Sequence, residues 1–236
     1  MNKIVSVVTG ASRGIGEAIA RKFAEEKHSL AIFGRDEEKL SRLAKELTQL
    51  GSKVLVFTGD VGDPQFVDNS IKKVLEEFDQ IDHLVNNAGV AIFKKFEDTS
   101  LEEFQLQINA NLYGVFNFSK SVLSSMIERK SGSIINISSL AGKNGFQYGT
   151  TYSATKHAVM GFTKSLMLEV REHNIRVAAV CPGSVVTDMI MNSDMKPSKP
   201  EKILDPMDVA EVVASIIKLP PRALISEVEI RPTNPK

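Results

Sequence analysis

A tyrosine and a lysine, Tyr152 and Lys156, stand four residues apart in a segment of helical hydrophobic period. Residues four apart lie on the same face of a helix, so the phenol and the ammonium can act together. A free phenol has a pKa of about 10 and is a poor base at pH 7. We expect the positive charge of Lys156 to lower the pKa of Tyr152. Tyr152 could then donate a proton to a carbonyl oxygen or remove one from an alcohol.

Two serines, Ser138 and Ser139, follow a short apolar run upstream of Tyr152, and Ser139 precedes it by 13 residues. A serine hydroxyl here could hydrogen-bond the oxygen that Tyr152 protonates, which makes it a positioning group and not a nucleophile. Asn111 is an unusual polar residue inside a predicted helix, where it could also cap or kink that helix. Proton transfer at a carbonyl oxygen pairs naturally with hydride transfer from a nicotinamide.

A glycine-rich turn, T-G-A-S-R-G-I-G, occupies residues 9–16 directly after the first apolar run. Gly10 can make a tight turn, Gly14 lets the backbone approach a pyrophosphate, and Gly16 lets the next helix pack closely. The N–H groups and dipole of that helix favour phosphates. The sequence therefore predicts a dinucleotide site that includes Gly10, Ser12, Arg13, Gly14, Ile15 and Gly16.

Two arginines bear on which dinucleotide this site takes. Arg13 lies in the glycine turn and Arg35 follows the second predicted strand, and guanidinium groups suit a 2′-phosphate. An NAD enzyme usually has a carboxylate at the end of that strand, where this chain has Gly34. Asp36 is the alternative ribose ligand, but it fits better as a helix N-cap. We predict a preference for NADP(H).

Short apolar runs alternate with segments of helical period along the whole chain, which favours a parallel sheet with helices on both faces. Most of the runs are apolar throughout, as in strands covered on both faces. Ligands of such sheets bind at the carboxyl ends of the strands. The predicted strands are Ile4–Val8, Leu30–Phe33, Val54–Phe57, His83–Asn86, Ser133–Ile137, Arg176–Val180 and Val228–Ile230. The predicted helices are Gly14–Glu26, Asp36–Leu50, Pro64–Phe78, Leu101–Arg129, Tyr152–His173 and Pro206–Leu219.

The size and composition fit one α/β domain over residues 1–236, with a mobile flap at 184–205. Lys and Arg number 29 and so do Asp and Glu, which argues against nucleic acid or membrane partners. The one cysteine, Cys181, cannot form an internal disulfide or a zinc cluster, which fits the cytoplasm. We predict no metal site. The apolar run at the N-terminus is too short for a signal peptide.

The glycine spacing and several later motifs together resemble the short-chain dehydrogenase/reductase superfamily, in its compact single-domain branch. The resemblance implies a doubly wound Rossmann fold with a seven-stranded, mostly parallel sheet. It covers residues 4 to about 190, roughly four-fifths of the chain. The matching motifs are Asp60-Val61, Asn86-Asn87-Ala88-Gly89, Asn111 in Asn-Leu-Tyr-Gly, Ser139, Tyr152-x-x-x-Lys156, and Pro182-Gly183 with Thr187.

The resemblance also implies roles for individual residues. Asp60 and Val61 would border the adenine, and Asn87, Ala88 and Gly89 would line the cofactor, although Asn and Gly are common at strand ends for structural reasons as well. Pro182, Gly183 and Thr187 would hold the nicotinamide end. The catalytic group would be Asn111, Ser139, Tyr152 and Lys156, with Asn111 holding a water that carries protons to and from Lys156. Relatives associate through long helices, which implies a homodimer or homotetramer.

A mainly apolar pocket is expected for a small ketone, aldehyde or secondary alcohol, because its Met-rich walls can adapt to varied shapes. Its walls would include Phe93, Phe146, Tyr148 and Met189, next to Ser139. The residues after the last strand differ from the glycine-rich ending usual in 3-oxoacyl-[acyl-carrier-protein] reductases, and that activity is an alternative. They are more similar to NADP-dependent 3-hydroxy acid dehydrogenases and sepiapterin-reductase-like proteins. A nucleotide-binding sensor or scaffold without turnover is the alternative of another class.

Overall fold

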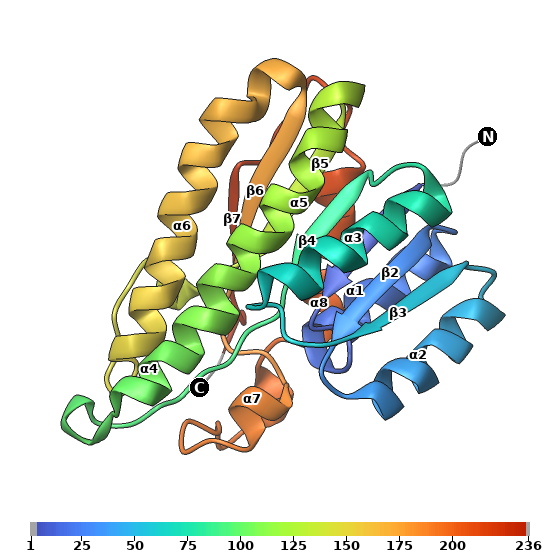
Figure 1. The fold of residues 1–236 in the computed structure, drawn as a ribbon. Helices are drawn as coiled ribbons and strands as arrows, with labels where there is room; N and C mark the ends of the chain where they lie inside the picture. The colour runs from blue at the N-terminus through green and yellow to red at the C-terminus, as the bar shows by residue number, and fades with distance from the viewer. Residues whose placement is uncertain (1–3, 235–236) are drawn as a thin grey trace.

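A single parallel sheet organises the chain in the computed structural model, which describes residues 4–234 (Figure 1). The strands lie in the order β3-β2-β1-β4-β5-β6-β7, and each pair of neighbours is parallel. This confirms the predicted doubly wound sheet. The strands are β1 (Val5–Thr9), β2 (Ser29–Gly34), β3 (Val54–Thr58), β4 (His83–Asn86), β5 (Gly132–Ile137), β6 (Ile175–Pro182) and β7 (Glu227–Ile230).

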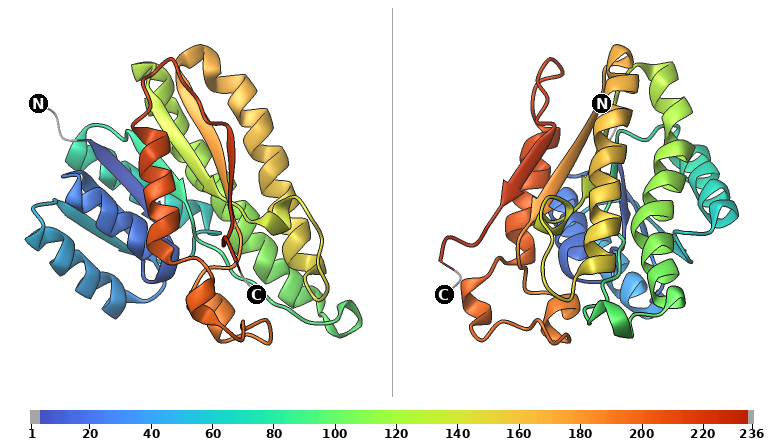
Figure 2. Two further views of the ribbon diagram at one scale, coloured as in Figure 1. Left: turned by 180° about the vertical axis from the view of Figure 1, so that it is seen from behind. Right: turned by 90° about the vertical axis from the view of Figure 1, so that its left-hand side faces the viewer.

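Helices cover both faces of the sheet, as the edge-on view in Figure 2 shows. Alternate residues of a strand point to opposite faces, so Val8 packs beneath α1, α2 and α8 while Val5 and Val7 pack beneath α3, α5 and α6. The helices are α1 (Gly14–Glu25), α2 (Glu37–Gln49), α3 (Pro64–Phe78), α4 (Leu101–Ile108), α5 (Gly114–Arg129), α6 (Thr150–Val170), α7 (Asp188–Met191) and α8 (Pro206–Ile217). Short 3-10 turns are η1 (Phe96–Asp98), η3 (Leu140–Gly142), η4 (Arg171–His173) and η5 (Pro200–Lys202).

The predicted helix 101–129 is not a continuous α-helix, because the π-helical turn η2 (Asn109–Tyr113) separates α4 from α5. Its cause lies in the side chain of Asn111, which bonds the backbone of Val90 in both directions: Nδ2 donates to the carbonyl oxygen at 2.9 Å and Oδ1 accepts from the N–H at 2.8 Å. A π-turn is a common device for placing a functional side chain inside a helix.

Aspartates begin three of the helices. Asp36 accepts a hydrogen bond from the N–H of Lys39 at 3.0 Å, which confirms its prediction as an N-cap. Asp63 and Asp205 cap α3 and α8, and each is followed by a proline at the first helical position. Because the carboxylate of Asp36 is used in this way, α2 begins directly behind the end of β2.

The predicted flap, residues 184–205, contains α7 and η5 and lies below the carboxyl ends of the strands in Figure 1. Val185 and Leu204 pair as an isolated bridge at its two roots, and both are buried in the core under α8. The flap is therefore a loop fixed at both ends, and its mobility stays a prediction. Among residues 4–234, no helix has the length and apolar character needed to cross a membrane.

Candidate active site

An elongated pocket of about 550 Å³ opens at the carboxyl ends of β1 to β5. The sequence predicted fifteen of the residues that line it, and these come from six separate parts of the chain. They are Gly10, Ser12, Arg13, Gly14, Ile15, Arg35, Asp60, Val61, Asn87, Ala88, Gly89, Tyr152, Lys156, Thr187 and Met189. The pocket joins the glycine turn at one end to the tyrosine and lysine at the other, and the flap borders it through Thr187, Asp188 and Met189.

The glycine turn adopts a backbone that its glycines permit. Gly10 and Gly14 have φ values of +64° and +58°, in the left-handed region where side chains are disfavoured. Gly16 does not line the pocket: a Cβ there would lie 2.3 Å from the carbonyl oxygen of Gly10, so this glycine serves packing of α1. The result is a turn whose backbone is exposed to the pocket at the start of α1, as a phosphate site requires.

Asn87 and Thr9 hold the end of β4 against this turn. The Oγ1 of Thr9 accepts hydrogen bonds from the N–H groups of Asn87 at 2.9 Å and of Ala88 at 3.0 Å. The amide of Asn87 donates back to the carbonyl oxygens of Thr9 and Gly10, at 3.0 and 3.2 Å. Asn87 thus has the structural role that the sequence left open, while the same segment lines the pocket.

Positively charged side chains gather where β2 ends. Arg35 and Lys39 are exposed and line the pocket there with Arg13. Lys39 was missed from the sequence, although its place three residues after the N-cap Asp36 puts it on the first turn of α2. Its ammonium lies 3.7 Å from a carboxylate oxygen of Asp36. The guanidinium of Arg13 pairs instead with Asp188 of the flap at 3.2 Å.

Asp60 and Val61 line the pocket beside the π-turn. Asp60 accepts hydrogen bonds from the N–H of Gly62 at 2.8 Å and the side-chain amide of Asn109 at 3.2 Å. Val61 is buried, and a Cβ on Gly114 would lie 2.7 Å from its side chain. The sequence missed Leu106, Asn109 and Ala110 at this end, because only the π-turn brings α4 and η2 to the pocket.

Tyr152 and Lys156 are both buried at the other end of the pocket, on α6. The Lys156 ammonium lies 5.8 Å from the centre of the Tyr152 ring and donates to the carbonyl oxygen of Ile137 at 2.9 Å. Burial raises the pKa of Tyr152 to about 12, and a hydrogen bond with Ser139 acts in the opposite direction. Burial also lowers the pKa of Lys156 to about 8. The expected lowering of the Tyr152 pKa is therefore not found, because loss of hydration dominates.

The structure separates the roles of the two serines. Ser139 is the partner of the Tyr152 phenol, and its Oγ also accepts from the N–H of Ala141 at 3.1 Å as the N-cap of η3. Ser138 lines the pocket, but its hydroxyl is buried and donates to the carbonyl oxygen of Lys156 at 3.3 Å. Ser139 bonds the phenol but is not among the pocket-lining residues, and its role in holding a substrate oxygen beside Tyr152 stays a prediction.

Asn111 is buried near Tyr152 and Lys156 but contacts neither of them by a described hydrogen bond. Besides its bonds to Val90, its amide donates to the hydroxyl of Thr155 at 2.9 Å. A Cβ on Gly89 would lie 3.0 Å from the Asn111 Oδ1 and 3.8 Å from the Lys156 Nζ, so these three residues adjoin. A proton relay through Asn111 stays a prediction.

Three aromatic rings run from Tyr152 toward the surface. Phe93 meets the Tyr152 ring edge-on at 5.6 Å between centroids, and Phe146 meets Phe93 at 5.8 Å. Tyr148 is exposed, with a left-handed backbone (φ +66°), and its carbonyl oxygen accepts from the N–H of Lys94. Met189 lines the pocket from the flap. Of the four predicted wall residues only Met189 lines the pocket, while Phe93, Phe146 and Tyr148 are not among its lining residues. Their role as a substrate wall stays a prediction.

Pro182 and Gly183 do not line the pocket, unlike their neighbour Thr187. Pro182 is buried at the end of β6. A Cβ on Gly183 would lie 3.3 Å from the side chains of Leu140 and Pro232. These two residues turn the chain from β6 toward the flap, and their role in holding the nicotinamide end stays a prediction.

The sequence and the fold match those of known dehydrogenases. The family model for short chain dehydrogenases matches residues 4–198. An uncharacterized oxidoreductase from Staphylococcus aureus is 36% identical over 97% of this chain and 96% of its own. The alcohol dehydrogenase from the archaeon Thermococcus sibiricus, solved with 5-hydroxy-NADP, has a TM-score of 0.90 at 36% identity, covering 98% of this chain and 97% of that one. A Phe-to-Trp variant of actinorhodin polyketide ketoreductase, solved with NADPH, has a TM-score of 0.90 at 34% identity. This match covers 98% of this chain and 96% of that one.

The site combines a glycine turn at the end of a parallel sheet with a buried tyrosine and lysine in the same pocket. This combination defines a class of dinucleotide-dependent proteins. The chain belongs to the short-chain dehydrogenase family.

Proposed function

We propose that this chain is an NADP(H)-dependent oxidoreductase that transfers a hydride between the nicotinamide and a ketone or aldehyde, or a secondary alcohol in reverse. The observation that carries the proposal is one continuous pocket with the glycine turn at one end and the Ser139-bonded phenol of Tyr152 at the other. Similar structures solved with NADP or NADPH support the choice of cofactor.

The residues of the pocket fit a phosphorylated dinucleotide. Gly10 and Gly14 have left-handed backbone conformations, which leave the backbone at the start of α1 exposed to the pocket. There is no room for a side chain at Gly10, because a Cβ there would lie 2.8 Å from the Cα of Ala88. Arg35 and Lys39 supply positive charge at the end of β2, where Asp36 is already bonded as an N-cap. A bound nicotinamide would supply the hydride chemistry that no side chain can.

The protein's own part is to hold a carbonyl oxygen and provide its proton. With a pKa of about 12, the Tyr152 phenol is protonated at neutral pH and can donate to that oxygen. Ser139 orients the phenol and can donate a second hydrogen bond. Lys156, anchored on the carbonyl oxygen of Ile137, places a cation beside the phenol as negative charge develops on it. With its phenol protonated near pH 7, the site is in the state that carbonyl reduction requires.

Two alternatives from the sequence can be tested beside this proposal. A 3-oxoacyl-[acyl-carrier-protein] reductase would use the same side chains on a thioester substrate. A sensor without turnover would keep the dinucleotide pocket but would not need the buried Tyr152 and Lys156, whose burial costs stability. A cytoplasmic location is a further proposal, and so is a homodimer or homotetramer, which the exposed Phe116 and Leu168 of α5 and α6 support.

The decisive test follows NADPH absorbance with a panel of neutral ketones, aldehydes, 3-hydroxy acids and 3-oxoacyl thioesters. We expect NADPH-dependent reduction of at least one neutral ketone or aldehyde, with much less activity from NADH. Turnover of thioesters alone would favour the acyl-carrier-protein activity. Tight NADPH binding with no turnover of any panel member would favour the sensor.

A further inference from the structure

An ion pair crosses the pocket between the glycine turn and the flap. The Nη1 of Arg13 lies 3.2 Å from the Oδ2 of Asp188, although 175 residues separate the two. Both side chains are about half exposed, at 58% and 50%, and both residues line the pocket. Arg13 stands at the N-cap of α1 with an extended backbone, and its guanidinium, which has only donors, makes no capping bond to the helix.

The position of Asp188 does not depend on this ion pair. The preceding residue, Thr187, packs against the glycine turn, because a Cβ on Gly14 would lie 3.1 Å from its Cγ2. The roots of the flap, Val185 and Leu204, are buried in the core. Removing the charge of Asp188 should therefore leave α7 where it is, and its main effect should be electrostatic.

The three carboxylates that line the pocket have different partners. Asp36 caps α2 and pairs with Lys39, and Asp60 is bonded to Gly62 and Asn109. Asp188 is the carboxylate that neutralises Arg13. Arg13 and Arg35 both line the pocket, and a 2′-phosphate bound there would be a second strong acceptor for a guanidinium.

We propose that Asp188 is a specificity-determining residue that competes with the 2′-phosphate of the dinucleotide for the guanidinium of Arg13. The inference rests on the proposed function, since it needs a bound dinucleotide. The pair is exposed, so the competition should be modest. Because NADH has a hydroxyl where NADPH has the phosphate, the competition should weaken NADPH binding and leave NADH binding nearly unaffected.

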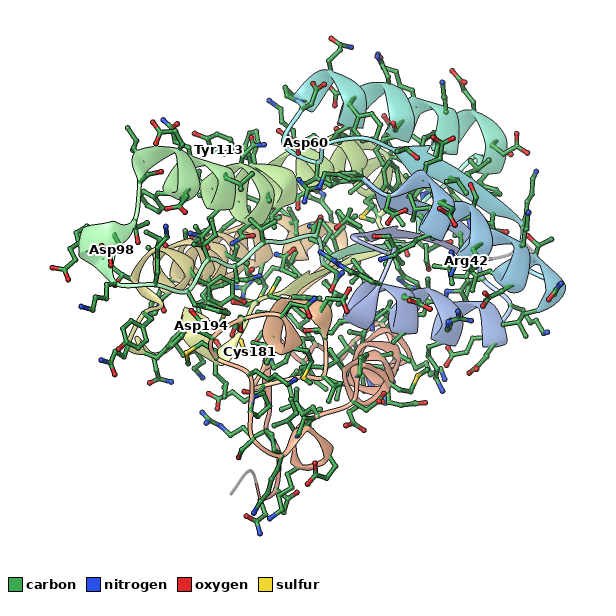
Figure 3. All side chains as sticks on the ribbon, turned by 90° about the horizontal axis from the view of Figure 1, so that it is seen from below. Arg42, Asp60, Asp98, Tyr113, Cys181 and Asp194 are labelled. Carbon is green, nitrogen blue, oxygen red and sulfur yellow. The ribbon has the colours of Figure 1, made fainter. Side chains whose placement is uncertain are left out.

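The test measures dissociation constants for NADPH and NADH by fluorescence titration at fixed ionic strength, with no substrate present. Asp188→Asn should tighten NADPH binding by about threefold to fivefold, the range of one exposed ion pair. NADH binding should change by less than about twofold. Asp194→Asn is the matched control: it removes the same charge from the same flap, outside the pocket lining. Figure 3 labels Asp194 well away from the pocket residue Asp60.

A double-mutant cycle shows whether the effect passes through Arg13. In an Arg13→Ala background, Asp188→Asn should no longer change the ratio of the two dissociation constants. The inference would be overturned if Asp188→Asn and Asp194→Asn gave the same ratio of NADPH to NADH dissociation constants. It would also be overturned if the effect of Asp188→Asn on that ratio persisted in the Arg13→Ala background. Either result would leave the proposed function intact. Failure of the unmodified chain to bind either dinucleotide would overturn both.

Discussion

Tyr152 is the residue on which turnover should depend most directly. Its ring is held by α6 and by the edge of Phe93, so removal of the hydroxyl and of its bond with Ser139 should not move it. Tyr152→Phe should lower kcat by about two to four powers of ten, the usual share of general acid catalysis. The dissociation constant for NADPH should stay within about twofold, because little binding surface is lost. Stopped-flow kinetics measure kcat, and fluorescence titration measures the dissociation constant for NADPH. Retained activity would contradict the role of Tyr152 as the proton donor.

The raised pKa of Tyr152 also predicts a pH dependence. Alcohol oxidation needs the phenolate, whose fraction below a pKa of about 12 increases tenfold per pH unit. The rate of oxidation should therefore rise from pH 7 to 10, while carbonyl reduction, which uses the protonated phenol beside the charged Lys156, should decline above about pH 8 as Lys156 loses its proton. Initial rates in both directions on one substrate pair provide the comparison. A plateau in oxidation starting near pH 7 would mean that Lys156 stabilises the phenolate more than burial opposes it.

At the scale of elements, Gly16 determines how closely α1 approaches β1. A Cβ there would collide with the carbonyl oxygen of Gly10 and the amide of Asn87, at 2.3 and 2.5 Å. Gly16→Ala should cost about 1 to 3 kcal/mol in unfolding free energy and weaken NADPH binding, because the glycine turn must shift. Gly161→Ala is the matched control, since nothing lies within 4 Å of its Cβ position on α6. That change should be neutral or stabilising by about 1 kcal/mol. Denaturant unfolding measures both, and equal stabilities would contradict the packing role.

The sequence predicted the elements well where one local signal decides the outcome. The glycine turn, the N-cap Asp36 and the all-apolar strands are such cases, since turn geometry, capping and two-sided burial act within a few residues. Prediction failed where the outcome depends on contacts between distant segments. The π-turn needs Asn111 to bond Val90, and Asp188 reaches Arg13 only because the flap is fixed at both roots.

At the scale of the whole molecule, the carboxyl and amino ends of the strands carry different kinds of side chain. The pocket occupies the carboxyl ends of the strands, while His28 and His83 lie at the amino ends with ring centroids 5.8 Å apart. His28 pairs with the hydroxyl of Ser6 at 2.9 Å, and the Nδ1 of His83 is buried without a hydrogen-bond partner in the described part of the chain. Burial, and then His28, lower the pKa of His83 to about 4, although Asp82 opposes this.

This buried imidazole predicts a loss of stability in mild acid. His83 takes up its proton near pH 6.5 when the chain is unfolded but only near pH 4 when it is folded, so the unfolded state binds more protons between these values. Stability should fall as the pH falls through this window, by about 3 kcal/mol at pH 4 from this group. His83→Gln should flatten the pH dependence, whereas His157→Gln, which alters an exposed histidine, should not. Urea unfolding at pH 4 to 7 measures this, and identical slopes for both variants would contradict it.

The bridge between Val185 and Leu204 has a consequence for how such a protein can diversify. The segment beyond Thr187 and Asp188, which contact the glycine turn, leaves and rejoins the core at two neighbouring points, so its length and composition can change without separating the sheet from α8. Doubling the length of a flexible loop costs only about 0.6 kcal/mol in closure entropy. The segment can therefore be replaced by another of different length or sequence. Such a replacement would change which substrates fit beside Met189 and would leave the sheet and Tyr152 in place.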